Sequence, residues 1–395
     1  MDVKRFGNRV LKAACPAVFL VSACVGKTTN EIAPVTPSPT PVTTTETTVF
    51  ADCFLNDGMT LPEIDAKWTV LSGHAEITDG VIHKTEQASE YEPVVLQMEQ
   101  NGVAQTYEDM LLLDPYVAYV IAYFSENGDE KESLKLAYTY NCRYWFKLNK
   151  DNAVLKPETG TRRLRDPSFV RRKDGTFTLL ATQGYDTDAI YAFDTADFST
   201  YTGERLLQVN PRGEQAWAPE AFYDRTIDQY VIIWSSVKDG GMYYNLSPDL
   251  CTFSPPQKLL DTGFPVIDGT VVRDGERAAI ILKDEREPME TYSQLFAGWS
   301  DHGWQNFSKF SEPFSGHQSE GPMIMKCLDT DGYDIYYDDY TRFQFRAYHT
   351  DDLFSGNFEP IPDTELMIPL DDPAHSHAIP VTWKELERLM QIYGE

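Results

Sequence analysis

Acidic residues that recur at nearly constant intervals could do chemistry together in this chain. The four are Asp166, Glu220, Asp268 and Glu320, at intervals of 54, 48 and 52 residues. If a repeating fold brings equivalent positions together, their carboxylates converge although they are distant in sequence. Like charges held close together raise the pKa of at least one carboxyl. One acid then keeps a proton while another stays charged, which is the combination that cleavage of a glycosidic bond requires.

The surroundings of Asp166 illustrate the repeated pattern. Pro167 disfavours the helical region for the residue before it, so we expect Asp166 in extended geometry. The apolar run that follows and the Asp174–Gly175 pair predict a strand that enters a hairpin. A carboxylate is thereby placed at the mouth of a strand. The alternative is that such acids only cap backbone N–H groups at turns.

A period of about fifty residues with several short strands in each unit is typical of propeller blades. Asp114–Pro115 lies 52 residues before Asp166, and His375 lies 55 residues after Glu320. Residues 111–395 therefore have room for five blades. We expect the first and last repeats to share one blade, because closing the ring removes exposed sheet edges. A short helix from Trp383 to Met390 is predicted to end the chain.

Composition supports an all-β fold. The chain has 395 residues, of which 13% are aromatic, and Asp-Gly, Asn-Gly and Gly-Gly pairs are common. The formal net charge of −27 argues against binding to nucleic acid, whose phosphates attract Lys and Arg. These features fit a secreted protein that acts on a neutral partner.

The N-terminus predicts export. Residues 1–24 contain Lys4, Arg5 and Arg9 and then an apolar run over 13–23, which is too short to span a bilayer. The stretch that ends at Cys24 resembles a bacterial lipoprotein box. By that resemblance Cys24 is lipidated and anchors the protein to a bacterial membrane, at the outer membrane or the cell surface. The alternative is an ordinary signal peptide that ends near a cysteine.

Two further segments precede the repeats. Residues 25–49 are rich in Pro and Thr and predict an extended tether that buries no core. Residues 50–110 alternate weakly and predict a small β-rich accessory segment, which is marginal as an independent domain. We assign this segment no chemistry. The catalytic domain is expected over 111–395.

The remaining cysteines are far apart in sequence. Cys53, Cys142, Cys251 and Cys327 show no Cys-x-x-Cys spacing, so a zinc site is not expected. Export permits disulfides, but the sequence leaves their pairing open.

Five stretches, taken in order, resemble glycoside hydrolase family 43, the five-bladed propeller arabinofuranosidases, xylosidases and related enzymes. They are Arg165–Pro167, Trp217–Glu220, Ile267–Gly269 with Lys283–Glu285 downstream, Ser319–Pro322 and His375–Thr382. Order and spacing agree over about 111–395. The resemblance therefore covers the whole predicted propeller.

The resemblance implies a role for each acid. Asp166 would be the general base that activates water, Glu320 the general acid, and Asp268 the residue that tunes the pKa of Glu320. These roles make an inverting hydrolase. The stretches also imply substrate-binding residues, namely Arg165, Trp217 and Glu220. Core packing is the alternative for Trp217, and a structural ion pair is the alternative for Arg165.

His375 matches a histidine that in family members lies under the site and helps to hold a central ion or water. Its alternative is an ordinary buried histidine. The chain has Ala374 where relatives often carry Arg, and His377 replaces a small residue. No cofactor is expected to be required, while a structural calcium ion in the central channel is allowed.

The function implied by this resemblance is an exported glycosidase that cleaves arabinofuranosyl or xylosyl linkages of plant cell-wall polysaccharide. One alternative is a non-catalytic carbohydrate-binding surface lipoprotein, which retention of all three acids argues against. Others are related propeller enzymes that act on galactosides or fructans, or glycoside phosphorylases. Fructan enzymes place Glu beside Cys, whereas Gly321 follows Glu320 here, and no basic cluster for phosphate is evident near the motifs. The expected partners are oligo- or polysaccharides, with membrane contact only through the lipid anchor.

Overall fold

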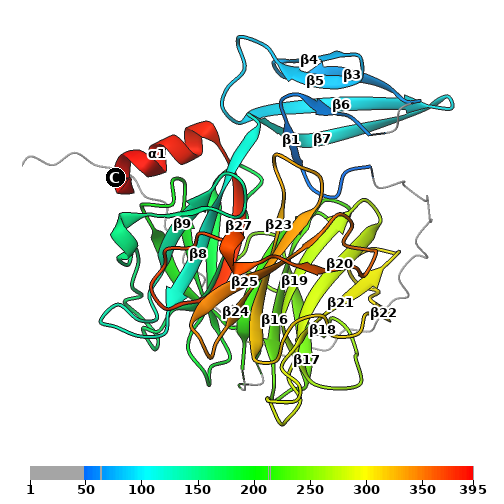
Figure 1. Cartoon of the computed structure of the whole chain (residues 1–395). Helices are drawn as coiled ribbons and strands as arrows, with labels where there is room; N and C mark the ends of the chain where they lie inside the picture. Colours follow the sequence, from blue (N-terminus) through cyan, green and yellow to red (C-terminus); the bar gives the residue numbers. More distant parts are fainter. Residues whose placement is uncertain (1–48, 63–64, 212, 214, 395) are drawn as a thin grey trace, which may run out of the picture. The chain divides into compact units, whose positions relative to one another are not determined.

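The computed structural model describes residues 49–62, 65–211, 213 and 215–394 (Figure 1). The predicted signal peptide, the lipidation site at Cys24 and nearly all of the predicted tether lie outside these residues. The described residues are mainly β-strands, and they belong to one compact unit that extends over Thr47–Glu395.

The N-terminal segment forms two small sheets. Its strands are β1 (Phe54–Asn56), β2 (Met59–Thr60), β3 (Lys67–Ser72), β4 (Ala75–Thr78), β5 (Val81–Lys84), β6 (Glu92–Gln100) and β7 (Val103–Leu113). One sheet has the order β1-β7-β6-β3 and the other the order β2-β5-β4. Strand β7 runs past residue 110, where the sequence suggested that the accessory segment ends.

Five four-stranded sheets follow within the described part of the chain, which confirms the predicted propeller. The first blade is β11 (Arg165–Arg171), β12 (Phe177–Thr182), β13 (Ile190–Thr195) and β14 (Thr202–Leu207). The second blade is β15 (Trp217–Asp224), β16 (Gln229–Ser236), β17 (Gly241–Ser247) and β18 (Gln257–Lys258). The third blade is β19 (Val266–Asp274), β20 (Arg277–Asp284), β21 (Leu295–Ser300) and β22 (Lys309–Phe310). The fourth blade is β23 (Ser319–Lys326), β24 (Tyr333–Asp339), β25 (Gln344–Thr350) and β26 (Glu359–Pro360).

The remaining sheet, the closing blade, joins distant parts of the chain as predicted. It contains β8 (Tyr116–Ser125), β9 (Lys135–Thr139), β10 (Trp145–Lys147) and β27 (Pro373–Thr382), in the order β10-β9-β8-β27. Figure 1 shows β27, in orange-red, beside β8, in cyan, and the two strands pair antiparallel from Pro373 opposite Ser125 to Thr382 opposite Tyr116. Because β27 is the innermost strand of this blade, the ring is completed by the last strand.

The N-terminal segment shares a hydrophobic core with the first two blades. Leu55, Leu96 and Leu112 of the segment belong to the same buried cluster as Leu180 and Trp234 of the blades. A polar contact adds to this packing, because Arg273 donates to the backbone oxygen of Ala51 at 2.6 Å. The segment is therefore packed on the propeller rather than held beside it by a linker.

The chain ends in helix α1 (Trp383–Tyr393), three residues longer than predicted. Thr382 and Glu385 form a capping box at its start. The described helical elements also include two 3-10 turns, η1 (Asn149–Asp151) and η2 (Asp363–Glu365). In the part of the chain that the structure describes, no helix is long and apolar enough to cross a membrane.

Candidate active site

Each of the five innermost strands carries an irregularity near its start. The pairing register shifts between Arg165 and Ser168 in β11, between Trp217 and Glu220 in β15, between Ile267 and Thr270 in β19, between Glu320 and Met323 in β23, and between Ala374 and His377 in β27. Such bulges bend a strand and redirect its side chains, and they are frequent beside active sites. The same kind of bulge therefore shapes the backbone of all five inner strands at the site.

A residue with positive φ lies inside each bulge. These residues are Asp166 (48°), Ala218 (46°), Asp268 (53°), Gly321 (55°) and His375 (29°). The expectation that Asp166 is extended was thus wrong: the bulge places it in the left-handed region despite the following proline. Non-glycine residues adopt that region only where the surrounding structure holds them, and functional sites are a common case.

The acidic spacing suggested that the four acids occupy equivalent positions in their blades, but the bulges show that they do not. Asp166 and Asp268 occupy equivalent positions, Glu320 comes one residue before its position, and Glu220 comes two residues after Ala218. Since side chains alternate along a strand and the bulge reorients them, this offset gives Glu220 a different environment from the other three acids.

One cavity of about 350 Å³ collects most of the predicted site residues. Arg165, Asp166, Trp217, Asp268, Glu320 and His375 all line it, together with Lys283, Tyr185 and Tyr340 among others. Glu220 is not part of its lining. The three acids with predicted catalytic roles therefore converge on one cavity.

Asp268 is the buried acid of the cavity. Burial raises the pKa of its carboxyl to about 6, against the opposing charges of His375 and Lys283, and the neighbouring Glu320 and Asp166 raise it further. The N–H of Gly321 donates to Asp268 Oδ2 at 3.2 Å, which connects the carboxyl to the bulge of the next inner strand. The charges of Asp166 and Glu320 therefore both raise the pKa of Asp268.

Glu320 is the more accessible acid, with 28% of its side chain exposed. Lys283, whose side chain is only 3% exposed, donates to Glu320 Oε2 at 2.9 Å and forms an ion pair of 2.8 Å with Glu285 Oε2. The Lys283 ammonium therefore fixes the position of Glu320 at the cavity wall. The sequence pointed to Lys283 only as part of a matching stretch, without a role.

His375 connects Asp166 with a further acid, Asp338. Its Nδ1 lies 3.6 Å from Asp166 Oδ1, and its backbone N–H donates to Asp338 Oδ2 at 3.0 Å. Gly321 packs directly on the imidazole, because a Cβ at that position would lie 2.9 Å from His375 Cγ. The glycine after Glu320 is therefore required by this close approach.

Asp338 is the site-adjacent residue that sequence reasoning missed. It lies on β24 directly opposite Glu320, it is fully buried, and its Oδ1 has no hydrogen-bond partner among the described residues. Burial raises the pKa of its carboxyl well above the usual range, and the charge of Glu320 adds to the effect. The available signal was an acid next to the apolar run Ile335–Tyr337, since buried Asp is rare unless it is paired.

Arg165 and Trp217 line the same cavity in different ways. Arg165 donates to Glu126 at 2.6 and 3.1 Å and to Glu132 at 3.2 Å, and its guanidinium lies 4.8 Å from the ring centre of Tyr185. Trp217 is half-buried and donates from Nε1 to the backbone oxygen of Tyr185 at 2.6 Å. Arg165 is thus already ion-paired, as its alternative interpretation held, while Trp217 presents an aromatic wall.

Glu220 lies apart from the cavity and is hydrogen-bonded by Thr270 and by the backbone N–H of Val271. Burial raises the pKa of its carboxyl to about 8, and Asp268 contributes in the same direction. The inner-strand residue His377 accepts a hydrogen bond from the N–H of Phe169 at 3.3 Å, and burial lowers its pKa to about 4. Glu220, which is half-buried, is therefore held by the neighbouring inner strand and does not line the cavity.

The surroundings of His375 offer a poor match to calcium, which takes six to eight oxygen ligands. Lys283 already supplies a cation to the carboxylates here. Among the described residues, the group of His, Cys and acidic side chains with donor atoms within 4.8 Å of one another is Cys142, Cys327 and Asp334, which lies elsewhere. A structural calcium ion, which the sequence allowed without requiring it, stays untested, and no step of the proposed mechanism depends on one.

Comparisons with known proteins identify the family of the chain. A family described as "probable glycosyl hydrolase domain", related to glycosyl hydrolase family 43, matches residues 114–387. An α-L-arabinofuranosidase of Bifidobacterium longum is 24% identical over 314 residues, which cover 62% of this chain and 29% of that protein. The chain thus spans less than a third of the length of this curated relative.

One of the solved structures that resemble this chain supports the fold, with a TM-score of 0.50. A family 43 β-1,3-galactosidase has a TM-score of 0.50 at 10% identity, covering 66% of this chain and 58% of its own. An endo-1,4-β-xylanase from Bacteroides thetaiotaomicron has a TM-score of 0.47 at 11% identity, covering 62% of this chain and 94% of its own. With the family match over more than half of its residues, the predicted resemblance is confirmed, and the chain belongs to the glycosyl hydrolase 43-related family.

Proposed function

We propose that this protein is an inverting glycoside hydrolase that releases arabinofuranosyl or xylosyl residues from plant cell-wall polysaccharide. The observation that carries the proposal is the convergence of Asp166, Asp268 and Glu320 on one cavity. Family membership supports the reaction class, and the similarity to an α-L-arabinofuranosidase supports a pentofuranoside as the sugar.

The proposed mechanism assigns one task to each acid. Asp166 accepts a proton from a water molecule, which attacks the anomeric carbon from one side. Glu320 donates a proton to the departing glycosidic oxygen on the other side, so that the product has inverted configuration. Asp268, whose pKa depends on both neighbours, adjusts the proton affinity of Glu320 through its charge.

The cavity favours removal of a terminal sugar. Its volume of about 350 Å³ is near the lower end of small-molecule sites, about 300–1,000 Å³. Trp217 and Tyr185 supply aromatic faces against which a sugar ring can pack, and Arg165 and Lys283 supply donors nearby. We therefore propose exo action on side chains or chain ends.

A panel of nitrophenyl glycosides tests the activity. The wild type should hydrolyse an arabinofuranoside or a xyloside, whereas Asp166→Ala and Glu320→Ala should be nearly inactive. Asp331→Asn is a matched control, since this exposed acid lies in the turn between β23 and β24, at the far end of the hairpin that carries Glu320. A wild type that hydrolyses no pentoside or galactoside would contradict the enzyme proposal and favour a carbohydrate-binding role.

Leaving-group chemistry separates the two roles. A dinitrophenyl glycoside needs little protonation of its leaving oxygen, so Glu320→Ala should lose much less activity on it than on a methyl glycoside. Asp166→Asn should lose similar activity on both, because attack by water is impaired in each case. Proton NMR of the first sugar released then tests inversion, and initial product of retained configuration would overturn the mechanism.

We also propose that the protein is exported and anchored by lipid at Cys24, as its first 24 residues suggest. Replacement of Cys24 by Ala in the full chain should release the protein from the membrane fraction and abolish incorporation of a labelled fatty acid. Membrane association that survives this replacement would exclude Cys24 as the anchor.

A further inference from the structure

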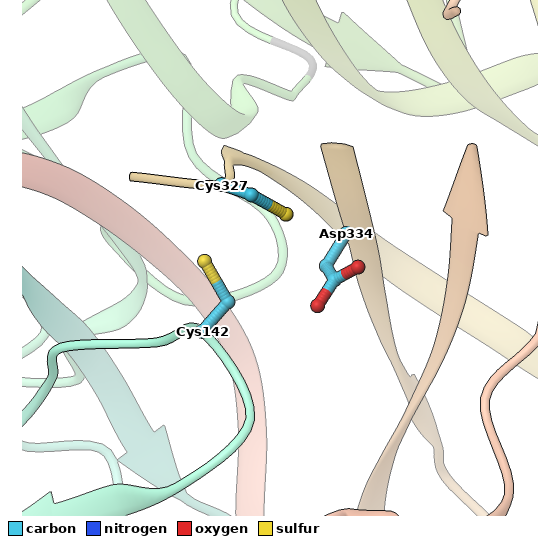
Figure 2. A group of neighbouring side chains, drawn as sticks. All are labelled: Cys142, Cys327 and Asp334. Atoms are coloured by element: carbon cyan, nitrogen blue, oxygen red, sulfur yellow. The ribbon is translucent and has the colours of Figure 1, made fainter. Parts of the chain in front are cut away.

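Two of the cysteines that the sequence could not pair lie side by side between neighbouring blades. Cys142 belongs to the loop between β9 and β10 of the closing blade, and Cys327 directly follows β23 of the fourth blade. Their sulfur atoms lie within 4.8 Å of each other and of a carboxylate oxygen of Asp334 (Figure 2). Cys142 is 0% exposed and Cys327 is 8% exposed. The pair therefore lies at the junction of two blades, with Cys327 nearer to solvent.

The backbone around the pair is already fixed by contacts across the junction. Tyr336 donates to the backbone oxygen of Cys142 at 2.9 Å, and Tyr119 donates to the backbone oxygen of Lys326 at 2.8 Å. The rings of Trp145 and Tyr336 pack with their centres 5.0 Å apart. These contacts hold both cysteine backbones in place on their opposite sides of the junction.

Asp334 is engaged with basic side chains and not with the thiols alone. Its Oδ2 accepts from Arg143 Nε at 3.3 Å, and its Oδ1 lies 2.7 Å from His349 Nδ1. Structural zinc needs four ligands, and the guanidinium of Arg143 opposes a second cation at this carboxylate. The arrangement therefore favours a bond between the two sulfurs over a shared metal ion.

We propose that Cys142 and Cys327 form a disulfide that covalently fastens the fourth blade to the closing blade. The proposal is independent of the glycosidase activity, because neither residue lines the catalytic cavity. It assigns the pairing that export alone would permit but not identify.

The bond forms by exchange with a disulfide oxidant such as oxidised glutathione. The Cys327 thiolate attacks one sulfur of the oxidant, forming a mixed disulfide and releasing one thiolate, which takes up the proton of Cys142. The Cys142 thiolate then attacks Cys327 Sγ and releases the second thiolate, which takes up from solvent the proton that Cys327 had lost. Two protein thiols are oxidised and one small disulfide is reduced to two thiols.

The two thiols differ in pKa and in exposure, and both differences favour Cys327 as the thiol that attacks first. The Cys142 S–H donates a hydrogen bond to the Cys327 sulfur, which lowers the pKa of Cys327 and, with burial, raises the pKa of Cys142. Cys327 is also the more exposed of the two. The first attack therefore belongs to Cys327, and Cys142 is the resolving thiol.

Mass spectrometry of the purified full-length protein tests the pairing. After equilibration with oxidised glutathione, the protein is alkylated under denaturing conditions without reductant and digested. A linked pair of peptides containing Cys142 and Cys327 is expected, with Cys53 and Cys251 alkylated. Complete alkylation of both Cys142 and Cys327, or retention of one equivalent of zinc that protects both, would overturn the proposal.

Thermal unfolding provides an independent measurement. Because the bond closes a loop from residue 142 to residue 327, reduction of the wild type by dithiothreitol should lower Tm by about 5 °C. Cys142→Ser and Cys327→Ser should show no response to dithiothreitol, while Cys251→Ser, at an exposed site, should respond like the wild type. If a serine variant does not fold, the response of the wild type still decides, and an unchanged wild-type Tm would contradict the proposal.

Discussion

Glu385 and Asp338 are both almost inaccessible to solvent, with exposures of 2% and 1%, but their surroundings differ. Glu385 receives two hydrogen bonds from Arg171 at 2.6 and 3.0 Å, one from Tyr91 at 2.9 Å and one from the N–H of Thr382 at 2.8 Å. Although burial opposes it, these partners lower the pKa of Glu385. Asp338 receives one backbone hydrogen bond and lies beside other acids, and its pKa is raised.

The difference separates structural acids from acids of the site. Glu385 connects helix α1, the first blade and the N-terminal segment, and every donor around it stabilises the charged form. The carboxyls near the cavity are instead crowded by like charge and by burial, which is unfavourable for folding. Acids retained in such surroundings are candidates for chemistry.

The strongest test of this comparison is Asp166→Asn. We expect kcat to fall about 10³-fold, the usual size of a general-base contribution, while Tm stays the same or rises because one crowded charge is removed. Activity assays and thermal unfolding of the same preparation measure both. If the variant loses much of its stability and its activity falls only in proportion to the folded fraction, Asp166 is a structural acid.

Glu385→Gln should show the opposite pattern. Removing one partner of this buried ion pair should lower the free energy of unfolding by about 3 kcal/mol, and the protein that remains folded should keep wild-type kcat. Denaturant unfolding and activity at low temperature provide the two readouts. Loss of kcat without loss of stability would contradict the structural assignment.

The raised pKa of Glu220 should be measurable as a pH dependence of the free energy of unfolding. Its carboxyl loses its proton near pH 4.5 when unfolded and near pH 8 when folded, so the folded state holds more protons between these values and stability falls as pH rises. Glu220→Gln has no such proton. Between pH 5 and 8 its free energy of unfolding should fall less than that of the wild type, by about 3 kcal/mol. Parallel curves for the two proteins would mean that Glu220 is charged in the folded state.

The smallest effect is expected for Asp338→Asn. Since burial and the neighbouring charge of Glu320 favour the neutral form of this carboxyl, an amide of the same shape should change stability at pH 7 by less than about 1 kcal/mol. Urea unfolding at pH 7 measures this change. A loss as large as that expected for Glu385→Gln would show that Asp338 is a charged, paired acid.

The repeat architecture was predictable because it depends on the period of the strands and turns. Acid–strand–turn units of about fifty residues were enough to predict five blades, and the unpaired edges of an open ring were enough to predict that β27 completes the closing blade. Asp166, Asp268, Glu320 and His375 were found for the same reason.

The wrong predictions concern single residues within a repeat and not the repeat itself. The bulge in β15 places Ala218 where a carboxylate was expected, so Glu220 is two residues out of phase. Likewise, Asp166 adopts positive φ because a tertiary bulge overrides the local preference of a residue before proline. Asp338 lies on a second strand, where cross-strand register rather than sequence spacing places it beside Glu320.

The order of strands in the closing blade has a consequence for protein synthesis. His375 and the inner strand that carries it are made more than 200 residues after Asp166. A chain that is still emerging from the ribosome or a translocation channel can contain Asp166, Asp268 and Glu320 but has no β27 to pair with β8. The complete site is therefore assembled only after β27 has been delivered, so we expect no hydrolysis by a nascent chain that ends before this strand.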